Sequence, residues 1–327
     1  MSILSKNKRL LMMVGWLIVA LLCAGCLAGS STSAPDTAGQ AYLTVKDSTG
    51  RTVTLPKKPE RLVVLSPSFL DLLYAVGGQA VGRPNTKTEA IPEAATQLPE
   101  VGFVYNINLE KVVSLQPDLV IAVQGMHDSL VPALESNHIP VLVLKYKTLD
   151  DTIETIRLLG NIAGTQAKAE NIITDMQQKI RAITDKIPTD KQRKVAILFA
   201  TSKSVTVQLD RTIAGSIAQK LGLTNIASGT APLNEDSDNV PYSLEKLVES
   251  DPDDVFVVTM GSAAEIEKRM KADVESNPAW ASLRAVKNGK VSFLPSQLFL
   301  LNPGLKMPDA VEYMAKISYP EVYGSVK

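Results

Sequence analysis

The chain has 327 residues, of which 45% are hydrophobic, and this length is sufficient for two domains with sizeable apolar cores. Its 34 basic and 34 acidic residues balance, which argues against the strongly basic face that nucleic-acid binding requires. Both cysteines, Cys23 and Cys26, lie near the N-terminus, so the rest of the chain can form neither an internal disulfide nor a Cys-based metal site. Two histidines, His127 and His138, exclude a site built from three imidazoles.

The N-terminus has the order of an export signal. Three basic residues, Lys6, Lys8 and Arg9, precede the apolar run Leu10–Leu22. The run is shorter than the ~20 residues needed to span a bilayer core of ~30 Å. We therefore expect residues 1–25 to be removed, which would leave 31 basic against 34 acidic residues.

The signal ends in Ala24-Gly25-Cys26, which resembles the end of a bacterial lipobox. Cys23 is a departure, because leucine is usual at its position. We expect lipidation at Cys26, with an ordinary signal peptide or an uncleaved anchor as the alternatives. Residues 26–41 are rich in Ser, Thr, Ala, Gly and Pro, a composition typical of a flexible tether.

The following residues alternate short apolar strands with helical stretches. A hairpin is predicted first, over residues 43–55. The first series then has strands at 61–65, 119–123 and 141–144 and helices at 69–77, 109–115 and 129–136. A second series has strands at 194–199, 255–259 and 290–294 and helices at 213–221, 244–249 and 307–318. Continuous apolar runs suit strands buried on both faces, so the alternation predicts an α/β fold.

One longer helix separates the two series. Within residues 150–187, apolar side chains recur three or four residues apart, at Ile172, Met176, Ile180, Ile183 and Ile187. Pro188 ends this pattern. The expected layout is an N-terminal α/β lobe over 42–165, a linking helix over 166–190 and a C-terminal α/β lobe over 191–327.

A phrase occurs once in each lobe, as Asn108–Ile121 and Ser243–Phe256. Each has a polar N-cap, a Leu-Glu-Lys start, a Pro-Asp pair and then an apolar strand. Glu110 and Glu245 fall in the first helical turn, where a carboxylate stabilises the helix dipole by ~0.3–1 kcal/mol. They are either helix-start charges only, or a matched pair that docks to basic pockets of a two-fold-related partner.

Five phrases, taken in order and with their spacing, resemble the class III substrate-binding proteins of iron-siderophore, heme and cobalamin ABC importers. They are Val45–Val53, Pro59–Ser68, Asn108–Ala122, Ser243–Asp253 and Pro278–Val291. The resemblance covers nearly all of the mature chain. One departure is Asp71, where relatives usually have glutamate.

The resemblance implies two Rossmann-like lobes joined by one long rigid helix, here about residues 168–187, with a ligand cleft between the lobes. It also implies that Glu110 and Glu245 contact arginines of the permease dimer, which works with its ATPase. Ligands of open α/β sheets bind beyond the carboxyl ends of the strands. The cleft candidates in those loops are Ser68, Phe103, Tyr105, Met126, His127, Lys203, Tyr242 and Phe299.

The candidates suggest different ligand chemistries. The four aromatic rings could form flat apolar walls or simply pack inside the lobes. Met126 or His127 could ligate heme iron axially, although His127 could instead cap the following helix or lie exposed. Lys203 and Arg83, with Lys145 and Lys147 as weaker candidates, offer only limited support for an anionic catecholate, so a neutral or weakly charged chelate fits at least as well.

We expect a binding protein rather than an enzyme, since the chain shows no nucleophile–base pair and no P-loop. The expected ligand is a ferric siderophore, with heme or cobalamin as alternatives and no resident cofactor or directly bound metal. We expect a monomer outside the cytoplasm, anchored by lipid. The competing hypotheses are an exported enzyme with a cation held by the acidic loop 234–238, or a surface sensor.

Overall fold

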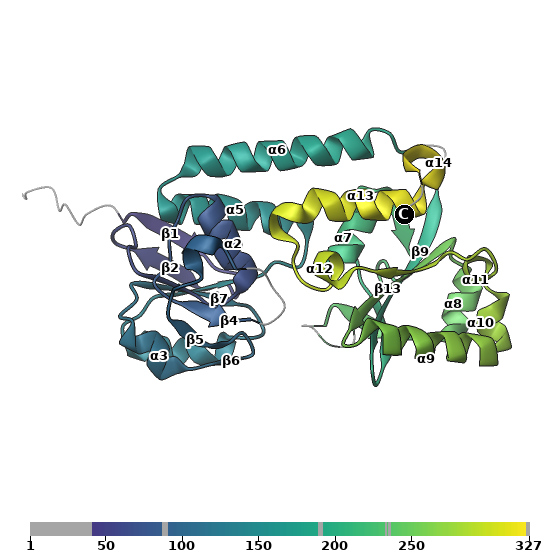
Figure 1. Ribbon diagram of the computed structural model, residues 1–327, viewed down its shortest axis with the longest axis horizontal. Coiled ribbons are helices and arrows are strands. Elements are labelled where there is room, and N and C mark those ends of the chain that lie inside the picture. The colour runs from purple at the N-terminus through teal and green to yellow at the C-terminus, as the bar shows by residue number, and fades with distance from the viewer. Residues whose placement is uncertain (1–40, 87–90, 189–191, 233, 235–236, 325–327) are drawn as a thin grey trace, which may run out of the picture. The chain divides into compact units, whose positions relative to one another are not determined.

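The computed structural model describes residues 41–86, 91–188, 192–232, 234 and 237–324 (Figure 1). The export signal, Cys26 and most of the tether lie outside these residues. Within the described part, no helix is both long enough and apolar enough to cross a membrane.

The first lobe is built on parallel strands. Strands β3 (Leu62–Val64), β7 (Leu119–Val123) and β8 (Val141–Leu144) form one parallel sheet in the order β3-β7-β8. A second sheet has the order β4-β5-β6, and the predicted hairpin pairs β1 with β2. Their bounds are β4 Arg83–Asn85, β5 Glu100–Phe103, β6 Asn106–Ile107, β1 Leu43–Lys46 and β2 Thr52–Leu55. The helical segments of this lobe are α2 (Pro67–Ala75), η1 (Glu93–Ala95), α3 (Leu109–Ser114), η2 (Asp128–Leu130) and α4 (Val131–Ser136).

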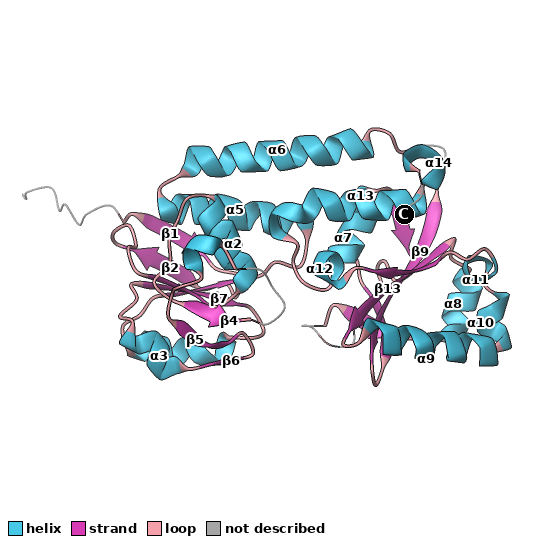
Figure 2. Cartoon of the chain, viewed as in Figure 1, coloured by secondary structure: helices cyan, strands magenta, loops and turns pink. Residues whose placement is uncertain are grey.

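The second lobe has one larger mixed sheet, in the order β12-β10-β9-β13-β14, with β11 also paired to β9. Its strands are β9 (Arg193–Thr201), β10 (Val205–Gln208), β11 (Leu223–Asn225), β12 (Asn239–Pro241), β13 (Asp254–Met260) and β14 (Val291–Leu294). The helices are α7 (Ile213–Lys220), α8 (Leu244–Ser250), α9 (Ala263–Ser276), α10 (Pro278–Ser282), α11 (Arg284–Lys287), α12 (Ser296–Phe299), η3 (Gly304–Lys306), α13 (Met307–Ser318) and α14 (Pro320–Tyr323). Helices lie on both sides of the sheet (Figure 2).

The central strands read as unbroken apolar runs because both of their faces are covered. Alternate side chains of a strand point to opposite faces. In β13, Val255 and Val257 pack in one core with side chains of α8, α9 and α10, and Phe256 and Val258 pack in another with α7 and α13. All four are fully buried. The α/β class predicted from these runs is thereby confirmed.

The helical region predicted within 150–187 is two helices. Helix α5 (Leu149–Ala163) ends at Gly164, whose φ of +68° is a left-handed conformation that favours glycine, and α6 (Gln166–Thr184) follows. The predicted linking helix over 166–190 corresponds to α6. The two helices approach closely at Gly160, where a Cβ atom would lie 2.4 Å from that of Ala169.

The largest hydrophobic core is shared by both lobes. It joins Ile121 of β7 and Ile156 of α5 to Ile173 of α6, Ile197 of β9 and Val311 of α13. Helices α6 and α13 lie side by side (Figure 1). The two lobes are therefore packed against a common set of helices.

A buried amide adds a polar link between the lobes. Asn302, which follows α12, donates from Nδ2 to the carbonyl oxygen of Tyr146 at 2.7 Å and to Oγ1 of Thr152 at 3.2 Å. Its Oδ1 accepts from the N–H of Gly304 at 2.7 Å. Because buried polar groups are costly when unpaired, this satisfied amide fixes how the segment before α13 meets the first lobe.

The repeated phrase folds in the same way at both helix starts. Asn108 Oδ1 accepts from the N–H of Lys111 at 2.9 Å before α3, and Ser243 Oγ accepts from that of Lys246 at 3.3 Å before α8. Both are N-caps, as the sequence predicts.

The Pro-Asp ends of the phrase also match. The residue before each proline has a positive φ, +48° at Gln116 and +39° at Asp251. Asp118 then accepts backbone N–H bonds from Glu60 and Arg61 at 2.8 and 2.9 Å, and Asp253 accepts one from Lys194 at 2.8 Å. Each aspartate thus ties its own strand to the start of the neighbouring parallel strand.

Candidate ligand-binding site

A cavity of about 500 Å³ lies between the two lobes. This volume falls within the usual range for small-molecule sites, ~300–1,000 Å³. Its lining is polar and comes from Gln124, Gly125, Asp128, Lys145, Lys147, Thr148 and Asp151 of the first lobe and Arg211 and Asp238 of the second. We call this cavity the cleft.

The topology explains why the first-lobe residues meet. Gln124 directly follows β7 and Lys145 directly follows β8, and these two parallel strands end at the same edge of their sheet. Thr148 caps the start of α5, and Asp151 completes the capping box by accepting from the N–H of Thr148 at 3.1 Å. The cleft therefore lies where strand ends and a helix start converge.

Three cations pair with two carboxylates in the cleft, and a third carboxylate, Asp128, also lines it. Lys145 pairs with Asp151 at 3.3 Å, while Asp238 pairs with Lys147 at 2.6 Å and with Arg211 at 3.2 Å. The Lys147–Asp238 pair joins the two lobes. Although each is paired with a carboxylate, the three cationic side chains remain partly exposed, at 50% for Lys145, 43% for Lys147 and 46% for Arg211.

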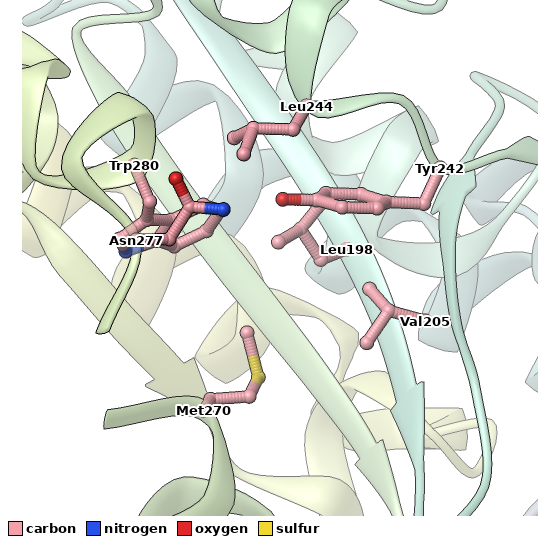
Figure 3. Close-up of a pocket in the computed structure, with 7 residues that line it drawn as sticks. All are labelled: Leu198, Val205, Tyr242, Leu244, Met270, Asn277 and Trp280. Carbon is pink, nitrogen blue, oxygen red and sulfur yellow. The ribbon is translucent and has the colours of Figure 1, made fainter. Parts of the chain in front are cut away.

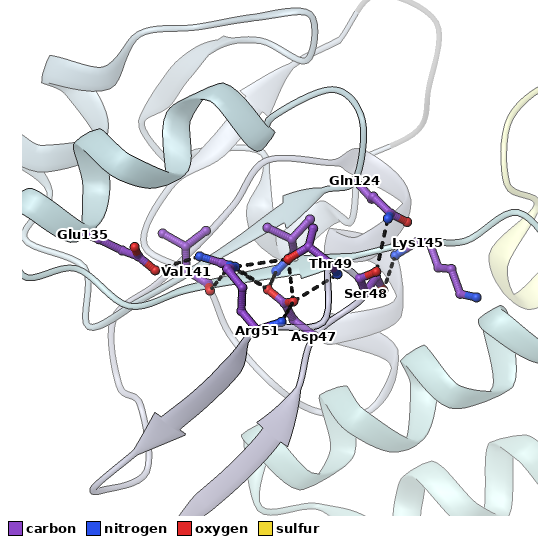
Figure 4. A network of polar contacts seen from close by, with 9 residues as sticks. Asp47, Ser48, Thr49, Arg51, Gln124, Glu135, Val141 and Lys145 are labelled. Carbon is purple, nitrogen blue, oxygen red and sulfur yellow. Dashed lines mark hydrogen bonds and ion pairs between the residues drawn. The ribbon is translucent and has the colours of Figure 1, made fainter. Parts of the chain in front are cut away.

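The β1–β2 turn supports this edge of the cleft (Figure 4). Ser48 accepts at its carbonyl oxygen from Nε2 of Gln124 at 3.1 Å and at Oγ from the N–H of Lys145 at 3.0 Å. Asp47 holds the turn by accepting from the N–H of Thr49 at 3.0 Å and pairing with Arg51 at 2.6 Å. The hairpin thus positions two of the cleft residues through backbone and side-chain hydrogen bonds.

Three other predicted cleft residues belong to the first lobe and are not among the residues that line the cleft: Phe103 ends β5, and Tyr105 and Met126 lie on loops. The rings of Phe103 and Tyr105 are stacked, with centroids 5.5 Å apart and planes 8° apart. Tyr105 is 79% exposed and Met126 is 47% exposed. Met126 stands between Gly125 and His127 on the loop that also supplies Gln124 and Asp128 to the cleft lining.

The structure contradicts an axial heme-ligand role for His127. Its side chain is 2% exposed, and both ring nitrogens are already hydrogen-bonded within the first lobe. Burial lowers the pKa of the imidazole below its ordinary value, against opposing effects of the Val104 carbonyl and the Asp128 carboxylate. His127 occupies the N-cap position of η2 but makes no cap bond with its side chain. Its burial contradicts the alternative that it lies exposed.

The prediction that Phe299 lines the cleft is wrong. It is buried, and its ring packs against Tyr313 with centroids 6.0 Å apart, so it belongs to the shared core. Ser68 is half-buried at the lobe junction, where its Oγ lies 3.5 Å from the carbonyl oxygen of Asn302. Neither residue is among the described residues that line the cleft.

Tyr242 lines a different, smaller pocket of about 160 Å³ within the second lobe (Figure 3). Its ring lies 6.5 Å from that of Trp280, and aliphatic side chains of β9 and β10 surround the space between them. Lys203 is exposed in the turn between β9 and β10, where its N–H donates to Oγ1 of Thr201. These positions leave both residues as candidates outside the cleft lining.

Glu110 and Glu245 are exposed and occupy the first turns of α3 and α8. Their helices have the same type of cap and lead into equivalent strands, so each carboxylate has the same local setting in its own lobe.

The sequence analysis missed Arg211 as a cleft residue and treated Asp238 only as part of an acidic loop. Their meeting depends on a hydrogen bond of 2.9 Å from the N–H of Leu209 to the carbonyl oxygen of Asp238, which brings the two segments together. The one available signal was the charged pair Asp210-Arg211 just before the Thr212 cap of α7.

The proposed cation site of the acidic loop 234–238 falls partly outside the described residues, at Glu235 and Asp236. Among the residues that the structure does describe, no group of three or more His, Cys, Asp or Glu side chains could hold a metal ion.

Comparison with known proteins agrees with this geometry. Residues 62–298 match the family model described as periplasmic binding protein, so the chain belongs to that family. The resemblance to class III substrate-binding proteins is thereby confirmed.

Three similar proteins illustrate the family. The Fe(3+)-citrate-binding protein YfmC of Bacillus subtilis is 27% identical over 88% of this chain and 89% of its own. YvrC of the same organism, named as an uncharacterized ABC transporter substrate-binding lipoprotein, is 24% identical over 97% and 99% of the two chains. The crystal structure of S. aureus IsdE complexed with heme is similar in fold, with a TM-score of 0.69 at 22% identity over 79% of this chain and 98% of that one.

Proposed function

We propose that this protein binds an anionic iron chelate outside the cytoplasm and delivers it to the permease of an ABC importer. The observation that carries the proposal is the cleft, in which Lys145, Lys147 and Arg211 present accessible positive charge from both lobes. The name of YfmC, a ferric-citrate-binding relative, favours the same ligand chemistry. The protein would act by binding and release, without a chemical step.

The cleft suits a ligand whose periphery carries carboxylates. Ammonium and guanidinium groups make charge-assisted hydrogen bonds to carboxylates, worth ~1.5–3 kcal/mol each. A chelate that contacts Lys147 and Arg211 together bridges the lobes, as Asp238 does in the structure. Binding would then stabilise one relative arrangement of the lobes.

Isothermal titration calorimetry on residues 41–327 tests the ligand class, with ferric citrate, hemin and cobalamin as probes. We expect saturable binding of ferric citrate. Lys147→Gln and Arg211→Gln should each weaken it about tenfold, because each removes a charged hydrogen bond. Lys179→Gln is the matched control, since Lys179 pairs with Asp175 on the exposed face of α6, at 2.8 Å.

The outcomes separate the alternatives. Binding of hemin or cobalamin without ferric citrate would keep the transport role and replace the ligand class. No heat with any of the three probes would contradict a metal-chelate ligand. If the control substitution changed the affinity as much as the cleft substitutions, Lys147 and Arg211 would not be ligand-binding residues.

The anchor and the docking pair complete the proposal. Cys26 would carry the lipid, so Cys26→Ala should move the protein from the membrane fraction to the soluble fraction. Glu110 and Glu245 would contact basic residues of the permease dimer, one from each lobe. The matched caps of α3 and α8 support this role, since they give both carboxylates the same local geometry.

A further inference from the structure

A small surface feature of the first lobe combines two stacked aromatic rings with a thioether, whose residue directly follows Gly125 of the cleft lining. It consists of Phe103, Tyr105 and Met126, and we call it the aromatic face. Tyr105 and Met126 are two of only four large hydrophobic side chains that are exposed within the described residues. The ring of Tyr105 is stacked on that of the partly buried Phe103, and a stacked pair offers a flat surface to the apolar part of a ligand.

The aromatic face belongs to two separate loops. Phe103 ends β5, and Tyr105 lies in the short turn before β6. Met126 lies on the loop after β7, which supplies Gln124, Gly125 and Asp128 to the cleft. The relative position of the rings and the cleft therefore depends on what connects these two loops.

His127 is that connection. Its Nδ1 accepts from the N–H of Val123 at 3.0 Å, at the end of β7. Its Nε2 lies 2.6 Å from the carbonyl oxygen of Val104, in the β5–β6 turn between the two aromatic residues. One buried side chain thus bonds to both loops.

The two bonds define the protonation state. Because Val123 donates to Nδ1, that nitrogen carries no proton, and the Nε2–H donates to the Val104 carbonyl. Only the neutral Nε2–H tautomer satisfies both partners. A second proton on Nδ1 would face the Val123 N–H and break the bond on the β7 side.

We propose that His127 is a positioning residue that holds the aromatic face against the edge of the cleft, so that Tyr105 and Met126 contact the ligand bound there. The inference rests on the proposed function for the identity of the ligand, and on the two hydrogen bonds for the role of His127. It replaces the axial-ligand role that the sequence suggested for this residue.

Ligand binding should weaken at low pH, because protonation of His127 breaks the link between the two loops. Burial lowers the pKa of the His127 imidazole below its ordinary value of 6.5. The charged group that acts on the ring within the described residues is the Asp128 carboxylate, which also accepts from the N–H of Gly125 at 3.0 Å. The link between the loops is intact at and above pH 6.5 and is lost as pH falls through the lowered pKa.

Two substitutions separate the two bonds of His127. His127→Asn keeps an acceptor near the Nδ1 position and loses the donor to Val104, whereas His127→Gln keeps an N–H near the Nε2 position. With ferric citrate as the probe, His127→Asn should weaken binding about fivefold to tenfold, the effect of one buried hydrogen bond. His127→Gln should restore most of the affinity.

Tyr105→Ala completes a double-mutant cycle. If His127 acts by holding the ring, His127→Asn combined with Tyr105→Ala should bind no more weakly than Tyr105→Ala alone. Fully additive losses would overturn the positioning role, as would unchanged affinity in His127→Asn.

A measurement without ligand keeps this test separate from the proposed function. With fluorotyrosine incorporated, the resonance assigned to Tyr105 through Tyr105→Phe should shift with the titration of His127. The same shift should be present at neutral pH in His127→Asn and absent in His127→Gln. A Tyr105 resonance that is identical in all three proteins and independent of pH would overturn the proposal, whether or not ferric citrate binds.

Discussion

The two lobes are alike at their helix starts and different at the cleft. Helices α3 and α8 each begin with a polar N-cap and are each followed by a residue of positive φ before a proline. In both lobes, the aspartate after that proline accepts a backbone hydrogen bond from the neighbouring strand. At the cleft, the first lobe supplies seven lining residues and the second supplies Arg211 and Asp238. The helix starts, which are repeated in the two lobes, are proposed to contact a symmetric permease dimer. The cleft, to which the two lobes contribute differently, is proposed to bind an asymmetric small molecule.

The largest effect should come from breaking the matched pair. Reversing both charges, Glu110→Lys with Glu245→Lys, should abolish uptake of radiolabelled iron, because two carboxylates would become cations facing basic sites. Ferric citrate affinity, measured by calorimetry, should stay the same. Glu249→Lys, on the last turn of α8, is the control. Normal uptake in the double variant would remove the docking role.

Asp118 and Asp253, the aspartates that tie neighbouring strands together, should contribute to the free energy of unfolding in proportion to the number of hydrogen bonds that each accepts. Asp118 accepts from two backbone N–H groups, whereas Asp253 accepts from one and pairs with Arg284 at an exposed site. We expect Asp118→Ala to lower the free energy of unfolding by ~2 kcal/mol and Asp253→Ala by about half as much. Urea denaturation measures both, and a larger loss at Asp253 would contradict this bond count.

The two lobes should also differ in acid response. Burial acts to raise the pKa of Asp47, but bonds from Thr49 and Arg51 bring it below the ordinary value. Its contribution to stability is therefore full above pH 3.8 and is lost as pH falls through the lowered pKa. Burial raises the pKa of Asp254 despite its pair with Arg193, so stability decreases as pH rises from 3.8 through that raised pKa.

The test is the slope of unfolding free energy against pH. Asp47→Asn should reduce the loss of unfolding free energy that occurs as pH falls below 3.8. Asp254→Asn should remove the decrease in unfolding free energy that occurs as pH rises above 3.8. Slopes are compared rather than absolute stabilities, since both substitutions also change hydrogen bonds. Equal slopes in the two variants would show that these aspartates do not titrate differently.

The smallest effect concerns the left-handed residues before proline. Gln116→Gly should stabilise the first lobe by up to ~1 kcal/mol, because glycine adopts a positive φ without strain. Asp251→Gly should not, since it removes the ion pair with Arg284. Thermal unfolding of the two variants gives the comparison, and a gain at Asp251 would mean that the exposed pair contributes nothing.

The features predicted correctly are those encoded locally. The apolar runs of β7 and β8 and the caps of α3 and α8 depend on residues within a few positions of each other. The start of the linking helix at residue 166 was predicted, but α5 was not recognised as a separate helix that ends at the left-handed Gly164, because the apolar repeat used for the prediction begins only at Ile172.

The cleft depends on contacts that no local pattern contains. Arg211 reaches it only because two distant segments of the second lobe are hydrogen-bonded to each other. His127 was one of two candidate axial ligands, but its Nε2 is bonded to the carbonyl oxygen of Val104, which lies in the β5–β6 turn and is distant in the sequence. Phe299 follows a strand end, as a cleft residue would, and is covered by Tyr313 of α13.

The shared core has a consequence for how the chain folds. Apolar side chains of α5, α6 and α13 pack with both sheets in one cluster. Separating the lobes would expose this cluster to water, so loss of either lobe would destabilise the other. Residues 41–327 should therefore unfold in a single cooperative transition, and neither half of the chain should form a soluble fragment by itself.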